Sequence, residues 1–183
     1  MSRLRLLILD ANIIIHLQRA EIWSQFLDRC EVIVSRTVLD EAHFYEDDHG
    51  QRLQIDLNPD IQSGKVTVID VTPANVKQFR DRFDPLYFQS LDDGEAESLA
   101  FLVAATPEHR ICSADKIVFK VLSHLGMDDR GVSLEEILAV VGLGRALPWA
   151  YTKKYREEYS RKGQQDLMMG IGLKKPAPGK SRK

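Results

Sequence analysis

Acidic side chains are the residues of this chain whose types and spacing are suited to chemistry. The stretch "SLDDGEAESLAFLVAA" places four carboxylates within six positions, and these are Asp92, Asp93, Glu95 and Glu97. A helix start tolerates such charge because its first N–H groups are unpaired and favour acids. A second explanation is a cation, because hard divalent ions bind carboxylate oxygens and remove their mutual repulsion. The other acids of the chain decide between these explanations.

The pattern of apolar residues predicts where those other acids lie. Short apolar or β-branched runs predict strands at 4–9, 31–35, 65–71 and within 109–115. Helical spacing predicts helices at 11–29 with a break near Ala20–Glu21, and at 37–47, 73–83, 92–105, 116–126 and 134–144. Strands that alternate with helices predict an α/β fold, as a three-layer α/β/α sandwich with a mainly parallel central sheet.

Charge divides the chain into two parts. From Tyr151 onward there are ten basic and three acidic residues, a net charge of +7, so residues 1–150 carry −9 of the overall −2. We therefore predict a domain at 1–145 and a basic C-terminal extension at 146–183, partly disordered because its last ten residues combine lysines with prolines and glycine. Such an extension suits nucleic-acid phosphates, or it is a solvated tail.

A cytoplasmic, soluble protein is the expected class. No apolar run reaches the roughly 20 residues that cross a bilayer, so no membrane partner is expected. The opening "MSRLRLLILDANIII" is interrupted by Asp10 and Asn12, which favours a buried strand and a helix start over a signal peptide. Cys30 and Cys112 are isolated in sequence and lie beside apolar runs, as expected for reduced structural thiols.

Five acids are predicted to meet at one edge of the sheet. Asp10 and Asp115 each follow a predicted strand, Glu41 lies in the helix after the second strand, and Glu95 and Glu97 lie at a later helix start. Functional groups of parallel α/β folds gather beyond the carboxyl ends of the strands. Mg²⁺ or Mn²⁺ would offset the repulsion there and keep positions open for a phosphate. Phosphodiester hydrolysis is the chemistry that such a site supports.

The same residues resemble the PIN-domain nucleases, which include the toxin ribonucleases of bacterial and archaeal toxin–antitoxin pairs. The resemblance rests on "LLILDANIIIHL", Glu41 in "TVLDEA", "DDGEAESLAFLVA" and "SADK", and it covers about residues 4–143 in order. The GEAE segment is similar to one subgroup of the family. The resemblance implies an α/β/α fold, Mg²⁺- or Mn²⁺-dependent cleavage of single-stranded RNA, and frequent homodimers.

The resemblance also implies roles for individual residues. The metal ligands and catalytic residues would be Asp10, Glu41, Glu95 and Asp115, with Glu97 as the next choice after Glu95. Asn12 and Ser113 would orient ligands. Exposed basic residues would hold the RNA backbone, and the candidates are Lys116, Lys153 and Lys154. A toxin would also have a small antitoxin protein as its partner.

Two alternatives stay open, and a third is excluded. Asp10 and Asp115 are each good helix N-caps, Glu41 alone suits a solvated position, and the acidic cluster alone suits a helix start. A catalytically silent PIN-like module that binds RNA or protein would keep the same acids. Phosphatases with an aspartate nucleophile need a second Asp two residues after the first, where this chain has Asn12.

Overall fold

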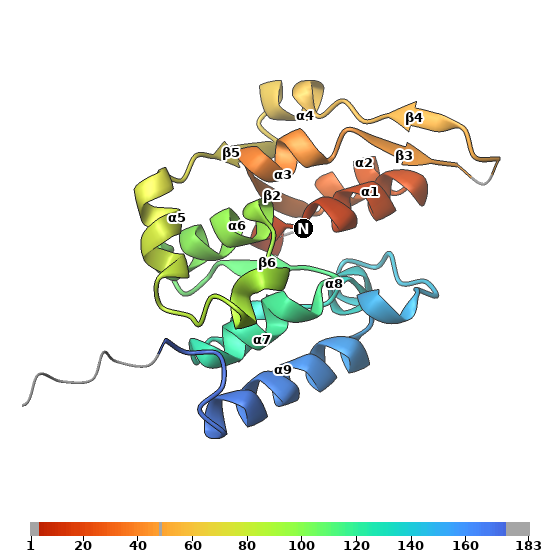
Figure 1. Ribbon diagram of the computed structural model, residues 1–183. Helices are drawn as coiled ribbons and strands as arrows, with labels where there is room; N and C mark the ends of the chain where they lie inside the picture. Colours follow the sequence, from red (N-terminus) through yellow and green to blue (C-terminus); the bar gives the residue numbers. More distant parts are fainter. Residues whose placement is uncertain (1–3, 48, 175–183) are drawn as a thin grey trace, which may run out of the picture.

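A five-stranded, all-parallel sheet forms the centre of the structure, a computed structural model that describes residues 4–47 and 49–174 (Figure 1). The strand order is β5-β2-β1-β6-β7. The strands are β1 (Leu4–Leu9), β2 (Cys30–Ser35), β5 (Val66–Ile69), β6 (Arg110–Cys112) and β7 (Gly131–Val132). This confirms the prediction of an α/β fold with a parallel central sheet.

Helices connect the strands and surround the sheet. They are α1 (Ala11–Arg19), α2 (Trp23–Leu27), α3 (Arg36–Glu41), α4 (Asn58–Gln62), α5 (Pro73–Arg80), α6 (Asp93–Ala104), α7 (Lys116–His124), α8 (Leu134–Val140) and α9 (Lys153–Met168). Three 3₁₀ turns add η1 (Tyr87–Ser90), η2 (Asp128–Arg130) and η3 (Trp149–Tyr151).

The strand order reverses direction beside β1. From β1 the chain proceeds outward through β2 to β5, and then returns to the other side of β1 for β6 and β7. The reversal between β1 and β6 is the point where parallel α/β sheets leave a crevice at the carboxyl ends of their strands. Asp10 follows β1 there, and its backbone N–H donates to the Cys112 carbonyl at the end of β6. The topology therefore brings the ends of these two strands together.

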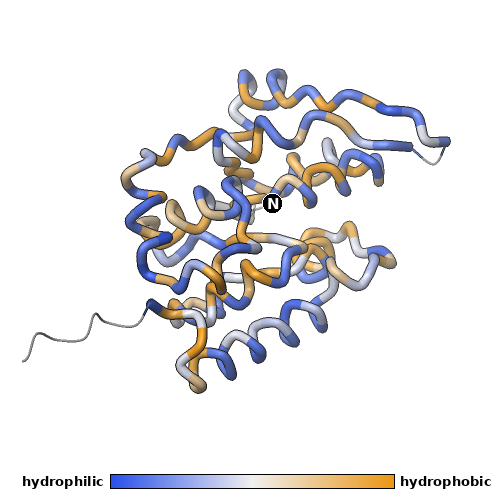
Figure 2. The backbone as a smooth tube through the Cα atoms, in the orientation of Figure 1, coloured by the Kyte–Doolittle hydropathy of each residue, from blue (hydrophilic) through white to orange (hydrophobic). Residues whose placement is uncertain are grey.

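Apolar side chains cover both faces of the sheet. On one face Leu9 and Val34 pack with α1, α2 and α8, while on the other face Ile8 and Ile111 pack with α5, α6 and α7. Successive strand residues point to opposite faces, so a strand with apolar residues at both positions is covered on both sides. Figure 2 shows this distribution, with hydrophobic residues concentrated in the strands and in the inner sides of the helices. The layers are compatible with a three-layer sandwich.

Local signals in the sequence placed several helix ends correctly. The chain breaks between α1 and α2, where Glu21 has a φ of 57°. Capping boxes begin α6, from Asp92 and Glu95, and α8, from Ser133 and Glu136. In each box the two side chains satisfy N–H groups that a helix start leaves unpaired.

The predicted helix at 37–47 is wrong in its second half. Helix α3 begins after Ser35, whose hydroxyl accepts from the Val38 N–H, and ends at Glu41. The chain then forms a hairpin of β3 (Phe44–Glu46) and β4 (Arg52–Gln54). Aromatic residues such as Phe44 and Tyr45 favour strands, and the pairing with β4 provides the hydrogen bonds that a continued helix would have supplied.

The basic extension is largely folded against the rest of the chain. Helix α9 lies along α7 (Figure 1), and it buries Tyr155, Ser160 and Gly163. A Cβ at Gly163 would stand 2.7 Å from the Lys120 Cα, so only glycine allows this approach of the two helices. Residues 149–174 are thus an integral layer rather than a loose arm, and the disorder predicted at the C-terminus falls on 175–183, outside the described residues.

The cysteines agree with one further expectation. Cys30 and Cys112 are both buried free thiols, and burial raises the pKa of each, to about 12 for Cys30. Within residues 4–47 and 49–174, no helix combines the length and apolar character that crossing a bilayer requires.

Candidate metal centre

A serine connects the two acids that follow β1 and β6. Asp10 is 5% exposed, and its Oδ2 accepts a hydrogen bond of 3.0 Å from the Ser113 hydroxyl. The Ser113 oxygen accepts from the Asp115 N–H at 2.9 Å, and the Asp115 Oδ1 accepts from the Ile117 N–H at the start of α7. Ser113 therefore holds the Asp10 carboxyl and the Asp115 backbone beside each other, and its role in orienting metal ligands stays a prediction.

The surroundings of Asp10 disfavour the ionised form of its carboxyl group. Burial raises its pKa from 3.8 to about 6, and the charge of Asp92 contributes in the same direction, against the hydrogen bond from Ser113. Asp10 makes no ion pair with any residue that the structure describes. A cation is the group that would return this carboxyl to its ordinary acidity.

Glu95 occupies the start of α6, facing the same region. It is 4% exposed, and its Oε2 accepts from the Asp92 N–H in the capping box. Burial raises its pKa from 4.5 to about 9, followed by the charges of Asp115, Asp92 and Asp10. Because the charges of Asp115 and Asp10 both act on its carboxyl, Glu95 is the α6 glutamate that lies near the acids after β1 and β6.

Glu41 approaches the acids from the last residue of α3. Its pKa rises from 4.5 to about 7, first through partial burial of the carboxyl and then through the charges of Asp92, Asp10 and Asp93. The approach depends on Gly94, since a Cβ there would lie 2.8 Å from the Glu41 Oε2 and 3.0 Å from the Val38 Cγ2. The glycine of the GEAE segment thus makes room for an acid from another helix.

We predict that Gly94→Ala lowers the affinity of these acids for Mg²⁺ or Mn²⁺ without lowering stability. The new methyl group displaces the Glu41 carboxylate, and loss of a supporting contact at a metal site costs about 10–100-fold in activity or metal affinity. Alanine also favours a helix over glycine by about 1 kcal/mol. Mn²⁺ affinity, by calorimetry, and urea unfolding would be measured together. Gly144→Ala is the control, because the nearest atom to its Cβ is 4.0 Å away; equal losses in both variants would contradict this role.

Glu97 points away from the cluster. It is 7% exposed, and its two carboxylate oxygens accept from the Thr37 N–H at 3.0 Å and the Val71 N–H at 3.3 Å. It therefore connects α6 to the segments that follow β2 and β5. Residues two apart on a helix point about 200° apart, which is why Glu95 and Glu97 serve different regions.

Glu97→Gln is expected to destabilise the fold by about 1–3 kcal/mol, because one buried backbone N–H would face an amide NH₂ instead of an oxygen. Urea unfolding would measure the change, with the exposed Glu157→Gln on α9 as the control. An unfolding free energy within about 0.5 kcal/mol of the wild type, the usual range for surface substitutions, would show that these two hydrogen bonds contribute little.

The remaining predicted site residues occupy the surface. Asn12 is exposed in the first turn of α1, and Lys116 is exposed at the start of α7. Lys153 and Lys154 are exposed at the start of α9, and the Lys153 Nζ lies 3.6 Å from Glu157. Asp93 already has a cationic partner, since it pairs with Arg80 at 2.6 Å.

Two tyrosines near the acids were not predicted. Burial raises the pKa of Tyr151, and the Asp10 charge is the next cause. Burial likewise raises the pKa of Tyr155 to about 12, followed by the Asp115 charge. Both come from the C-terminal layer, Tyr151 from η3 and Tyr155 from α9, and Tyr159 continues the four-residue spacing on α9. The four-residue spacing could have been noticed in the sequence. Only the packing of α9 shows that these tyrosines lie near the acids.

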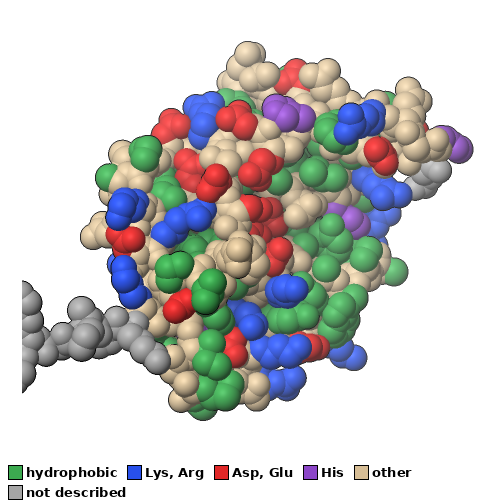
Figure 3. Space-filling view, viewed as in Figure 1, with side chains coloured by type: hydrophobic (Ala, Val, Ile, Leu, Met, Phe, Trp, Pro, Cys, Tyr) green, Lys and Arg blue, Asp and Glu red, His purple; other side chains and the backbone are tan. Residues whose placement is uncertain are grey.

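The donor set suits a hard cation. Besides burial, the charges of neighbouring acids raise the pKa values of Asp10, Glu41 and Glu95, and Asp92 and Asp115 are among those neighbours. Acidic side chains gather at the centre of the face in Figure 3, with lysines and arginines below them. Among the described residues, no three His, Cys, Asp or Glu side chains already stand in an arrangement that could hold an ion. The oxygen donors fit Mg²⁺ or Mn²⁺ in kind, and their side chains would have to turn toward it.

Comparison with protein-family models, with curated proteins and with solved structures found no significant match to this chain.

Proposed function

We propose that this protein is a metal-dependent endoribonuclease of the PIN type that hydrolyses RNA phosphodiester bonds. One observation carries the proposal. Three carboxyl groups from β1, α3 and α6 have pKa values raised to about 6, 7 and 9, and each is raised partly by charges of the others or of Asp92 or Asp115. A protein keeps such repulsion where function needs the charges together.

The fold supports the proposal by its topology. The acids lie at the point where the strand order reverses, which is the usual ligand site of a parallel α/β sheet. The alternative in which both acids are only helix caps fits Asp115, whose carboxylate accepts from the Ile117 N–H, whereas the Asp10 side chain makes no capping hydrogen bond to α1. It does not explain why Glu41 and Glu95 from two other helices approach them.

The chain's own residues would have distinct tasks. Asp10, Glu41, Glu95 and Asp115 would hold Mg²⁺ or Mn²⁺, and Ser113 keeps Asp10 and Asp115 oriented through its hydroxyl. The bound metal would supply an activated water and offset charge on the phosphate. Because Glu95 is protonated at neutral pH in the metal-free protein, it must release its proton as a ligand.

A cleavage assay tests this function. A labelled single-stranded RNA would be incubated with the protein in Mn²⁺ and, separately, in EDTA. Cleavage within the strand that stops in EDTA supports the endoribonuclease. RNA binding with no cleavage in Mg²⁺ or Mn²⁺ would overturn it in favour of a silent binding module. The toxin role, an antitoxin partner and a homodimer stay predictions.

A further inference from the structure

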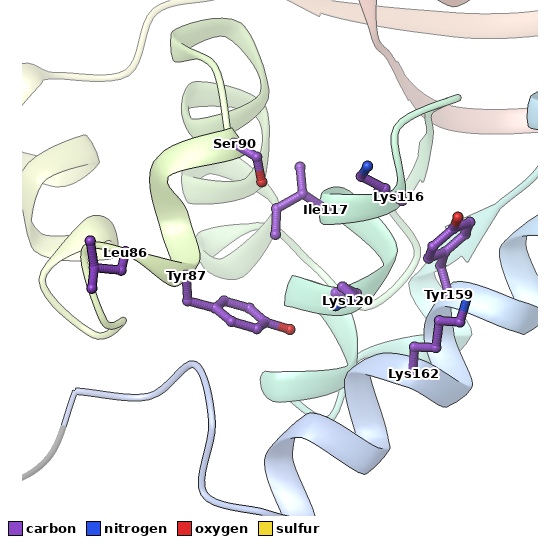
Figure 4. Close-up of a pocket in the computed structure, with 8 residues that line it drawn as sticks. All are labelled: Leu86, Tyr87, Ser90, Lys116, Ile117, Lys120, Tyr159 and Lys162. Atoms are coloured by element: carbon purple, nitrogen blue, oxygen red, sulfur yellow. The ribbon is translucent and has the colours of Figure 1, made fainter.

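A pocket lies beside the acidic cluster, between η1, α7 and α9. It has a volume of about 480 Å³ and combines three lysines with two tyrosines, namely Lys116, Lys120, Lys162, Tyr87 and Tyr159. Figure 4 shows Tyr87 reaching across the pocket from η1, with Tyr159 and Lys162 of α9 at the other end. Proteins that bind single-stranded nucleic acid commonly combine basic side chains with aromatic rings on which bases stack.

The lysines of the pocket differ in what they already bind. Lys120 pairs with Asp166 at 2.7 Å, and the Tyr87 hydroxyl donates to the same carboxylate at 2.9 Å, so these two side chains are fixed in the wall. Lys162 pairs with Glu158 and lies 4.5 Å from the centre of the Tyr159 ring. Lys116 is exposed and has no ion pair with any residue in the described part of the chain.

The position of Lys116 connects the pocket to the candidate metal centre. It directly follows Asp115, so the two side chains start from neighbouring Cα atoms about 3.8 Å apart. Lys116 also lines the pocket, so one residue of the pocket wall adjoins a candidate metal ligand in the chain. An RNA strand carries a phosphate at every nucleotide, so one phosphate can lie at the acids while the next lies at Lys116.

We propose that this pocket binds the RNA nucleotide adjacent to the cleaved bond, with its phosphate on Lys116 and its base against the Tyr159 ring. The inference rests on the proposed function for the identity of the strand. Stacking on a tyrosine ring tolerates every base. The pocket would therefore hold the strand in position without reading its sequence.

Binding in EDTA tests the pocket apart from catalysis. Fluorescence anisotropy would give the Kd of a labelled single-stranded oligoribonucleotide of about 12 nucleotides, somewhat longer than the minimal sites of such grooves, over a series of salt concentrations. Lys116→Ala should weaken binding about tenfold at low salt and reduce the salt slope by about 0.7, the value for one phosphate contact on a single strand. Tyr159→Ala should weaken it about tenfold, and Tyr159→Phe should bind nearly as well as the wild type.

Lys65→Ala is the matched control, since Lys65 precedes β5 at the opposite edge of the sheet and pairs there with Asp28. Urea unfolding of each variant would show whether α9 stays folded. The proposal is overturned if Lys116→Ala and Lys65→Ala weaken binding equally, if Tyr159→Ala binds as the wild type does, or if the wild type does not bind. A wild type that binds through the pocket but cuts no RNA would instead reject the nuclease function alone.

Discussion

Asp10→Asn is expected to lower kcat/KM for Mn²⁺-dependent RNA cleavage by at least about 10²–10³-fold, the cost of removing one preorganised electrostatic group from an active site. The substitution keeps the size of the side chain and removes the charge. Burial of the charged form is the main cause of the raised Asp10 pKa. An asparagine side chain carries no charge, so the variant avoids the free-energy cost of burying one. The shift of the Asp10 pKa from 3.8 to about 6 corresponds to about 3 kcal/mol, so the metal-free variant should be more stable than the wild type at neutral pH.

The matched control is Asp70→Asn. Asp70 directly follows β5 at the same edge of the sheet, but it is exposed and pairs with Arg36 at 3.2 Å. Steady-state cleavage by both variants and the wild type would be compared at one pH. If Asp10→Asn and Asp70→Asn both keep activity within a few-fold of the wild type, Asp10 is not a metal ligand.

Glu95 is expected to make the metal-free protein lose stability as the pH rises. Its folded pKa of about 9 lies above its ordinary value of 4.5, so the folded state holds a proton that the unfolded state has released. The unfolding free energy therefore falls between these two pH values, by an amount on the order of 5 kcal/mol if Glu95 keeps its full shift. Asp10 adds a smaller fall between about pH 4 and 6.

Urea unfolding in EDTA from pH 5 to 9 would measure this effect, with Glu95→Gln as the comparison. Glutamine can keep the capping box with Asp92 but has no proton to lose. The variant should therefore show a flatter dependence on pH. Saturating Mg²⁺ should flatten the wild-type curve as well, because the ion binds the ionised form. Parallel curves for wild type and variant in EDTA would show that Glu95 titrates normally.

Features that depend on contacts between residues close in the sequence could be predicted, and features that depend on contacts between distant segments could not. The capping box of Asp92 and Glu95 spans four residues, so the start of α6 was readable. The strand-ending position of Asp10 was also readable, because parallel strands bring their carboxyl ends to one edge. The helix predicted across residues 37–47 failed because strand pairing between β3 and β4, a contact outside that window, replaced it.

Other features of the site depend on contacts that no local pattern records. The sequence placed Glu95 and Glu97 at the start of the same helix, but it did not predict that Glu97 would accept from Thr37 and Val71. The need for Gly94 arises only once α3 places Glu41 against it. The C-terminal segment was read from its charge as an arm. Its buried Gly163 and Tyr155 make it a layer that carries tyrosines to the acids.

The layer formed by α9 also ties the C-terminal segment to the rest of the fold. Arg156 donates two hydrogen bonds to Glu136, of 2.8 and 2.9 Å, which connects α9 to α8. Beyond α9 the chain returns to the segment after α5, where the Asp84 N–H donates to the Gly172 carbonyl. The pocket between η1, α7 and α9 therefore has walls that are held on both sides. A positioned wall is what a binding subsite needs in order to act on a strand.

The central claim is that acids from separate elements share a divalent cation, and Mn²⁺ binding followed by isothermal titration calorimetry tests it most directly. We predict saturable binding by the wild type that strengthens from pH 6 to 8 and releases protons, and that weakens at least about tenfold in Asp10→Asn and in Glu95→Gln. Asp70→Asn should bind Mn²⁺ as the wild type does. Absence of saturable binding, or equal binding by all four proteins, would contradict the account.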